Sequence, residues 1–289
     1  MDIKNLYKYI SMAIMIRKAS GALEEFDPKK VEAAILRSGG TPEIAERVIK
    51  KLSKKLYKEI STKEIYRITF GLLDREQHSL ASRYDLKRAI MRLGPAGFSF
   101  ETYLGEVLRE HDYGVKLRQN VQGRCVEHEV DILLNKGDEH TIVECKYHNE
   151  DGIYTGLKSA LYTYARFLDL QEGFHKGKCE NFSSVWLATN TKFSSEAIQY
   201  ANCRELRLVG WRHPSDGGIE NLIESKGLYP ITILRKLDKM SKKMLSNANL
   251  MLLNDLIDKS PGEISSKTGI ANHKLRRIIE EAKEIVGRE

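Results

Sequence analysis

One stretch, residues 128–146, constrains the fold most, because it predicts a β-hairpin with charged side chains near its open end. Apolar runs at 130–134 and 142–143 flank a polar turn around Gly137 and Asp138, a pattern typical of two antiparallel strands. A turn centred between these two residues pairs positions whose numbers sum to 275. The register of the hairpin is therefore predicted along with its existence.

This register places Asp131 directly opposite Glu144. Side chains alternate along a strand, so Glu144 and Lys146 share one face while Val143 and Cys145 share the other. Two opposed carboxylates repel each other, and a divalent cation would remove that repulsion. Oxygen ligands suit Mg²⁺ or Mn²⁺, and the lysine would lie against metal-bound water. The pattern predicts a site for metal-assisted phosphodiester hydrolysis.

A simpler interpretation of the Glu144-Cys-Lys146 triplet is a solvated charge pattern on an exposed strand. Cross-strand charges of this kind are common in antiparallel sheets. The acidic Asp131 at the mirrored position, inside an otherwise apolar strand, favours the catalytic interpretation.

Together these residues resemble the core of PD-(D/E)xK nucleases, most closely the Mrr-type restriction endonucleases. Further stretches of the sequence match the family in order: an opening helix at 100–108, a first strand at 113–117, and a late strand, helix and strand within 185–211. The resemblance implies a restriction-endonuclease-like α/β domain over 98–235, with a mixed sheet flanked by helices.

The resemblance also implies roles for single residues. Asp131 and Glu144 would be ligands of Mg²⁺ or Mn²⁺, and Lys146 would position or activate the nucleophilic water. Glu144 stands where many Mrr-type members carry Gln, and Glu is the commoner residue in the wider superfamily. Glu101, in the opening helix, is either a further acidic contributor or a solvated residue at a helix start.

Length and composition favour a cytoplasmic protein of two or three domains. The chain has 289 residues and a formal net charge of +7, the sign expected of a protein that binds polyanions. Its four cysteines are widely spaced without a CxxC pair, which fits a reducing compartment. The uncharged stretch Tyr9–Ile16 is too short to cross a bilayer, so no membrane association is expected.

Residues 12–93 predict a separate small α+β block. A hairpin turns at Ser20 and Gly21, and Asp27-Pro28 caps a helix over 29–37. Further helices are predicted over 42–57, from the capping pattern at Ser61-Thr62-Lys63-Glu64, and over 78–93.

This block resembles an ATP-cone, a small regulatory nucleotide-binding domain. The matching residues include Ile16 to Gly21, Phe26-Asp27, Lys30-Val31, Ala81, Tyr84 and Arg88. The resemblance implies that Lys18, Gly21, Lys30 and Tyr84 bind ATP or dATP, with both lysines meeting phosphates. Ala19 and Ser20 replace an Arg and an Asp of the family pattern. The alternative is a block that keeps the fold and only packs on the nuclease or on a partner.

Residues 236–289 predict an all-α tail. A helix, a tight Thr268-Gly269-Ile270 turn and a second helix resemble a helix-hairpin-helix module. Such a module points backbone N–H groups at a DNA phosphate, which implies DNA contacts from Gly269, Lys274, Arg276 and Arg277. The alternative is an ordinary helical hairpin with solvated basic residues.

The sequence thus predicts a Mg²⁺-dependent DNA endonuclease of defence, repair or recombination, with ATP or dATP as a candidate effector. DNA is the expected partner, and a homo-oligomer is compatible with the chain. Two alternatives remain: a catalytically silent nucleotide-sensing DNA-binding protein, and a structure-selective RNA nuclease.

Overall fold

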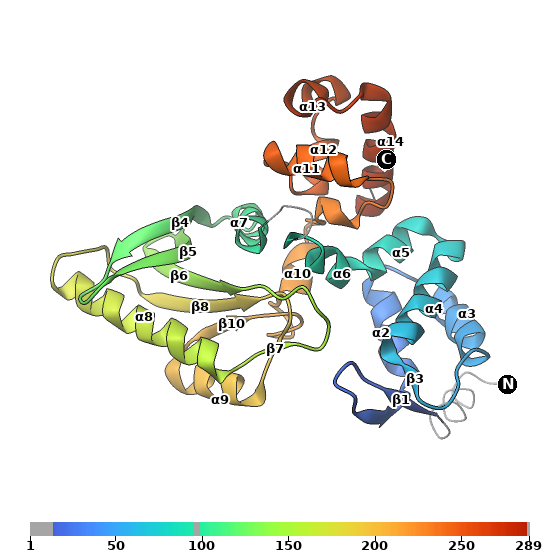
Figure 1. Ribbon diagram of the computed structural model, residues 1–289, viewed down its shortest axis with the longest axis horizontal. Helices are drawn as coiled ribbons and strands as arrows, with labels where there is room; N and C mark the ends of the chain where they lie inside the picture. Colours follow the sequence, from blue (N-terminus) through green and yellow to red (C-terminus); the bar gives the residue numbers. More distant parts are fainter. Residues whose placement is uncertain (1–13, 95–98, 288–289) are drawn as a thin grey trace.

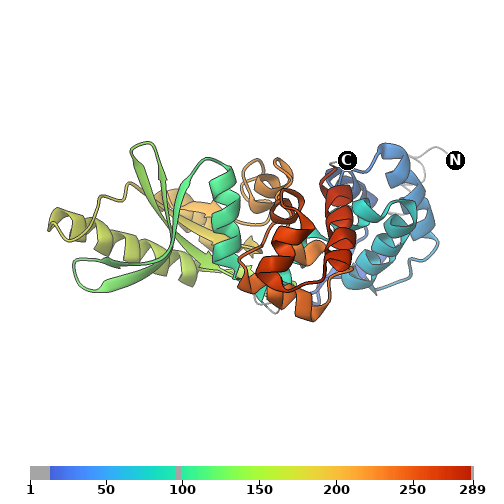
Figure 2. The same cartoon turned by 90° about the horizontal axis from the view of Figure 1, so that it is seen from above.

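The computed structural model describes residues 14–94 and 99–287. The domain limits predicted at residues 12, 98 and 289 lie outside these described ranges. Three regions follow one another along the chain: a small N-terminal region, a central region built on a sheet, and a C-terminal group of helices (Figure 1). Seen from above, the C-terminal helices lie over the junction of the other two regions (Figure 2).

The N-terminal region combines a small sheet with a set of helices. β1 (Met15–Arg17) pairs antiparallel with β2 (Leu23–Glu25) and parallel with β3 (Ile60–Ser61). Asp27 caps the first helix by accepting from the backbone N of Lys29 at 2.9 Å. The described helices are α2 (Pro28–Arg37), α3 (Pro42–Ser53), α4 (Thr62–Glu76), α5 (His78–Tyr84) and α6 (Leu86–Met91).

Two helix predictions for this region were wrong in their extent. α3 ends at Ser53 instead of residue 57. The helix expected over 78–93 is two helices, α5 and α6, which meet at Asp85. The Asp85 carboxylate binds the Arg92 guanidinium at 2.8 Å and also accepts from the Tyr66 hydroxyl.

The central region contains a five-stranded mixed sheet in the order β10-β8-β6-β5-β4. The strands β4, β5 and β6 form an antiparallel meander, and β8 and β10 run parallel to β6. Ile132 lies opposite Val143 and Lys136 opposite Glu139, which confirms the predicted register of the hairpin from its turn to Ile132. The pairing of β5 with β6 ends there, so Asp131 and Glu144 do not form the ladder pair that was predicted. The bounds are β4 (Gly114–Gln122), β5 (Glu127–Lys136), β6 (Glu139–Lys146), β8 (Ser184–Thr189) and β10 (Arg207–Val209).

Helices cover both faces of this sheet. α8 (Leu157–His175) and α9 (Ser195–Arg204) lie on one face, and α7 (Phe100–Glu110) lies on the other (Figure 1). A short sheet of β7 (Tyr154–Thr155) and β9 (Lys192–Phe193) lies beyond the end of β6, and α10 (Ile219–Glu224) follows β10. The mixed sheet between helical layers confirms the predicted fold class.

The C-terminal helices pack into the central region. Leu253 and Leu275 share one apolar cluster with Phe100, Trp186 and other residues of the central region. The elements are the 3₁₀ turn η2 (Ile231–Ile233), α11 (Lys239–Asn247), α12 (Leu253–Ile257), α13 (Pro261–Thr268) and α14 (Asn272–Val286). A second cluster fills the N-terminal region, and a third lies under α8 and α9.

The division between the first two clusters falls inside the N-terminal block. Leu80 and Ala81 of α5 belong to the N-terminal cluster. Ala89 and Ile90 of α6 belong to the cluster of the central region. Within the described ranges, no helix is long and apolar enough to cross a membrane.

Candidate active site

Asp131 lies at a break in the alternation of β5. Its neighbours Val130 and Ile132 would share one face of a regular strand, yet they pack into apolar clusters on opposite faces of the sheet. Arg118, the residue of β4 facing this break, has a positive φ of 48° and lies between Leu117 and Gln119. The side chain of Asp131 is thereby turned toward the neighbouring strand β6.

The three predicted catalytic residues lie close together where β6 ends beside the middle of β5. Asp131 Oδ2 accepts from the backbone N of Cys145 at 2.7 Å. Lys146 Nζ lies 2.5 Å from Glu144 Oε1. Glu144 is 6% exposed, whereas the Lys146 side chain is 35% exposed. A buried carboxylate, Glu144, is therefore paired with a lysine that reaches solvent, Lys146.

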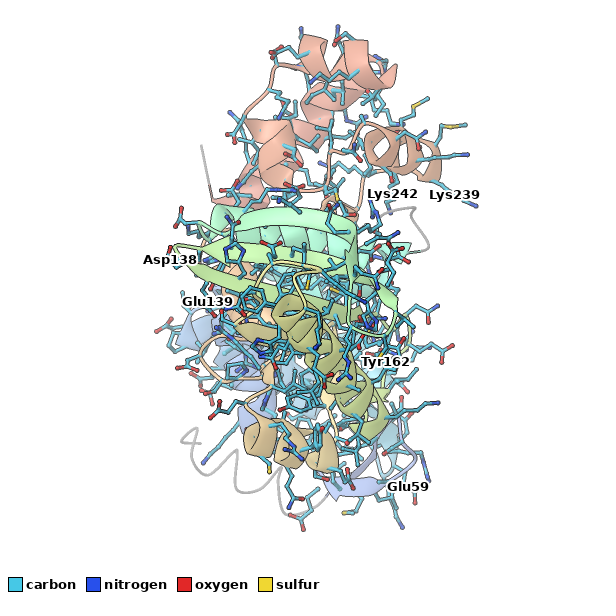
Figure 3. All side chains as sticks on the ribbon, turned by 90° about the vertical axis from the view of Figure 1, so that its left-hand side faces the viewer. Glu59, Asp138, Glu139, Tyr162, Lys239 and Lys242 are labelled. Atoms are coloured by element: carbon cyan, nitrogen blue, oxygen red, sulfur yellow. The ribbon has the colours of Figure 1, made fainter. Side chains whose placement is uncertain are left out.

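Arg166 of α8 completes the surroundings of Glu144. Its Nη1 donates to Glu144 Oε2 at 2.6 Å and to the carbonyl of Glu129 at 2.8 Å. Its Nη2 donates to the hydroxyl of Tyr162 at 3.1 Å, one helical turn earlier. In Figure 3, which has α8 in front, Tyr162 lies on the opposite side from Asp138 and Glu139 of the hairpin turn. Both oxygens of Glu144 thus contact a cation.

Among the residues that the structure describes, none forms an ion pair with Asp131. The pKa of its carboxyl is raised to about 6, mainly by burial and in addition by the negative charges of Glu144 and Glu101. The N–H of Cys145 and the charge of Lys146 act in the opposite direction. Glu101, at the start of α7, is therefore close enough to act on the site electrostatically, and Arg118 Nη1 lies 3.5 Å from its carboxylate.

The donor set fits a hard divalent cation. Asp131 and Glu144 offer carboxylate oxygens, and the Cys145 N–H and Lys146 offset only part of the cost of burying the negative charge of Asp131. Within the described part of the chain, no three His, Cys, Asp or Glu side chains group closely enough to form a closed metal cage. Mg²⁺ commonly binds through one or two carboxylates and keeps several waters, which matches two protein ligands at an accessible edge.

A cavity of about 740 Å³ lies between the N-terminal and central regions. Three of the residues predicted to bind nucleotide line it: Lys18, Lys30 and Tyr84. Gly21 lies at the tip of the β1–β2 hairpin with φ 84° and is not among the residues lining the cavity. Lys18 and Lys30 both contact Glu24, at 2.5 Å and 3.4 Å.

The predicted DNA-binding residues lie on the last two helices. Gly269 ends α13 with φ 74°, the left-handed conformation that a tight turn needs. Arg276 and Arg277 are exposed on α14. Lys274 forms an ion pair with Asp238, the N-cap of α11, so part of its charge is used within the protein.

A protein of Archaeoglobus fulgidus described as an uncharacterized protein is 44% identical to this chain over 185 residues, which are 64% of this chain and all of the relative. This chain belongs to the same family. A crystal structure titled as a protein of unknown function, AF1548, is similar at 42% identity and a TM-score of 0.56. The similarity covers 65% of this chain and 96% of that structure.

Family models match each region of this AF1548-like chain. An ATP cone domain matches residues 14–90, a restriction endonuclease of the Mrr type matches 95–213, and an AF1548-like C-terminal region matches 229–286. These matches confirm the resemblances to an ATP cone and to a restriction endonuclease. A structure of the MspJI restriction endonuclease with an oligonucleotide has a TM-score of 0.29 at 11% identity, over 83% of this chain and 48% of that one.

Sequence reasoning missed the role of several residues in this AF1548-like protein. Arg166 contacts Glu144 from α8, and no pattern in the sequence links these two residues. Arg83 and Lys87, which line the cavity beside the ATP cone, were also missed. Their sequence signal was the density of basic residues over 83–92, which helical periodicity alone does not assign to a site.

Proposed function

We propose that this protein is a metal-dependent endonuclease that hydrolyses phosphodiester bonds in DNA and responds to ATP or dATP. The observation that carries the proposal is the meeting of Asp131, Glu144 and Lys146 at one end of the sheet in a restriction endonuclease domain. The net charge of +7 and the exposed Arg276 and Arg277 support a nucleic acid as substrate.

Asp131 and Glu144 would hold the cation, which supplies Lewis-acid polarisation of the phosphate and a bound water of lowered pKa. The Cys145 N–H orients the Asp131 carboxylate. Arg166 anchors one oxygen of Glu144 from the buried side, so the other oxygen stays directed toward Lys146. The partly exposed Lys146 ammonium can donate a hydrogen bond to a water or a phosphate oxygen from its free N–H bonds.

Nicking of supercoiled plasmid in Mg²⁺ tests the proposal. We expect Asp131→Asn to abolish nicking and Lys146→Ala to lower its rate by about 10²- to 10⁴-fold. Mg²⁺ and Mn²⁺ affinities, measured by calorimetry, should fall in the Asp131 variant. Asp138→Asn, an exposed residue of the hairpin turn, is the matched control and should nick normally.

Glu144→Ala is a poorer probe. It would leave the Arg166 charge, whose side chain is 14% exposed, without its carboxylate partner. Removing one member of a buried ion pair costs about 3–5 kcal/mol, so lost activity would be confused with lost folding.

Equal nicking by wild type and Asp131→Asn would contradict the proposed site. The same proteins should be assayed on single-stranded and hairpin RNA. Cleavage of RNA without cleavage of DNA would make the protein an RNA nuclease. DNA binding with no cleavage of either substrate would indicate the catalytically silent, nucleotide-sensing protein.

A further inference from the structure

The cavity between the ATP cone and the restriction endonuclease domain is built by both domains. Nine basic and four acidic residues line it. Most of the basic residues come from the ATP cone, but Lys192 and Arg212 belong to the restriction endonuclease domain. Tyr154, exposed on β7, adds an aromatic ring. A concave, mainly basic surface with an aromatic side chain suits a nucleoside triphosphate.

A loop from the restriction endonuclease domain enters this cavity. It joins the end of β6 at Lys146 to β7, and in Figure 1 it reaches toward the hairpin of the ATP cone. The Asp151 carboxylate on this loop lies 3.7 Å from Lys87 Nζ and 3.9 Å from Arg88 Nη2. An acidic side chain of one domain thus neutralises two cations of the other.

The next residue of the loop fits closely against the ATP cone. Gly152 has φ 87°, and a Cβ built there would lie 3.1 Å from the Cβ of Ala19. Ala19 is one of the two positions that depart from the ATP-cone pattern, where the family has Arg. An arginine at this position would meet the loop, so the small side chain is compatible with the docked loop.

The start of the loop is fixed to the active-site end of the sheet. The His148 backbone donates its N–H to Asn190 Oδ1 at 2.8 Å, and Asn190 Nδ2 donates to the His148 carbonyl at 2.7 Å. The Tyr147 hydroxyl donates to the carbonyl of Met91, at the end of α6. The loop that carries Asp151 therefore begins at a fixed segment directly after Lys146.

We propose that this cavity is a nucleoside triphosphate site completed by Lys192 of the restriction endonuclease domain, and that Asp151 competes with the phosphates for Lys87 and Arg88. Nucleotide binding then displaces Asp151 and loosens the loop that follows Lys146. The inference rests on the proposed function, since it concerns how the nucleotide reaches the nuclease.

Calorimetric titration of the full-length protein with ATP and with dATP, without DNA, tests the shared site. We expect Asp151→Asn to lower the dissociation constant by about three- to tenfold, because it removes a competing charge. Glu150→Gln, exposed on the same loop and outside the cavity lining, should leave it unchanged. Lys192→Ala should raise the dissociation constant, whereas Lys176→Ala, exposed elsewhere in the same domain, should not.

Hydrogen exchange gives a second readout. Amides of residues 149–153 should exchange faster when ATP is bound, and this change should be smaller in Asp151→Asn, whose loop is already released. Equal affinities for wild type, Asp151→Asn and Lys192→Ala would overturn the proposal. So would the absence of ATP and dATP binding to wild type and Asp151→Asn at millimolar concentrations, or increased protection of the loop.

The two proposals fail separately. A protein that binds ATP with these mutational effects but does not nick plasmid retains the shared site and loses the nuclease function. A protein that nicks plasmid through Asp131 but binds no nucleotide loses the shared site and the response to ATP or dATP, and keeps the nuclease function.

Discussion

At the scale of single residues, the two carboxylates of the candidate site are held very differently. Glu144 is buried but contacts Lys146 and Arg166. Asp131 receives one backbone hydrogen bond and faces the charges of Glu144 and Glu101, and burial is the main reason that its pKa is raised to about 6. The ionised Asp131 therefore destabilises the folded protein in the absence of a cation.

The variant Asp131→Asn tests whether the ionised Asp131 carboxylate lowers the stability of the folded protein. The native carboxyl keeps its proton up to about pH 6, whereas an unfolded Asp loses it near the usual value of 3.8. The stability of wild type should therefore fall as pH rises from about 4 to about 6 and stay lowered above that. At pH 8 without metal, the variant should melt higher than wild type by about 2–4 °C, the shift expected for about 1 kcal/mol.

The higher melting temperature of Asp131→Asn should disappear below pH 4, where the Asp131 carboxyl of wild type is protonated in both the folded and the unfolded protein. Thermal melting followed by circular dichroism across this pH range measures it, with Asp138→Asn as the control. A variant less stable than wild type at pH 8 would show that Asp131 is structural.

At the scale of elements, the β5–β6 hairpin was predictable because alternation and turn residues lie within one short stretch. The sum of 275 is confirmed by Ile132 opposite Val143. The contact of Arg166 with Glu144 was not predictable, since it depends on how α8 crosses the sheet. The break at Asp85 was missed because the apolar periodicity continues through it, while the helices on either side enter different cores.

DNA binding by the C-terminal helices can be tested independently of DNA cleavage. Arg276 and Arg277 are exposed on α14, while Lys274 is paired with Asp238. Replacing both arginines with alanine should weaken DNA binding to all sequences alike and reduce the slope of log affinity against log salt by about 2. Fluorescence anisotropy at several salt concentrations measures this slope.

The control replaces Lys54 and Lys55, which are exposed on the ATP cone, with alanine. It removes the same charge from another surface and should leave the slope unchanged. Equal losses in both double variants would mean that net charge, rather than the α14 surface, determines binding.

At the scale of the whole molecule, the tail predicted as a separate unit over 236–289 shares its apolar core with the central region. The sequence shows that Leu275 is apolar and periodic but not which surface it meets. The core of the ATP cone, by contrast, is a cluster of its own. The stability of the tail and of the sheet should therefore be coupled, and that of the cone less so.

Tryptophan fluorescence can separate these units, because both tryptophans, Trp186 and Trp211, lie in the shared core. Leu275→Ala, at a position that is 0% exposed, should cost about 2–5 kcal/mol and lower the fluorescence-detected melting temperature. Ile49→Ala in the core of the ATP cone, at a position that is 1% exposed, should shift it much less. Equal shifts would mean that the protein unfolds as one unit.

The change of core at Asp85 has a practical consequence for protein engineering. Anyone transplanting this regulatory module onto another enzyme should keep α6, whose Lys87 and Arg88 line the cavity. The apolar Leu86, Ala89 and Ile90 on the same helix should then be replaced by polar residues, because they pack into the shared core of the central and C-terminal regions. Without these replacements, a fusion that ends at residue 93 would expose the apolar side chains of α6 to solvent and would promote aggregation.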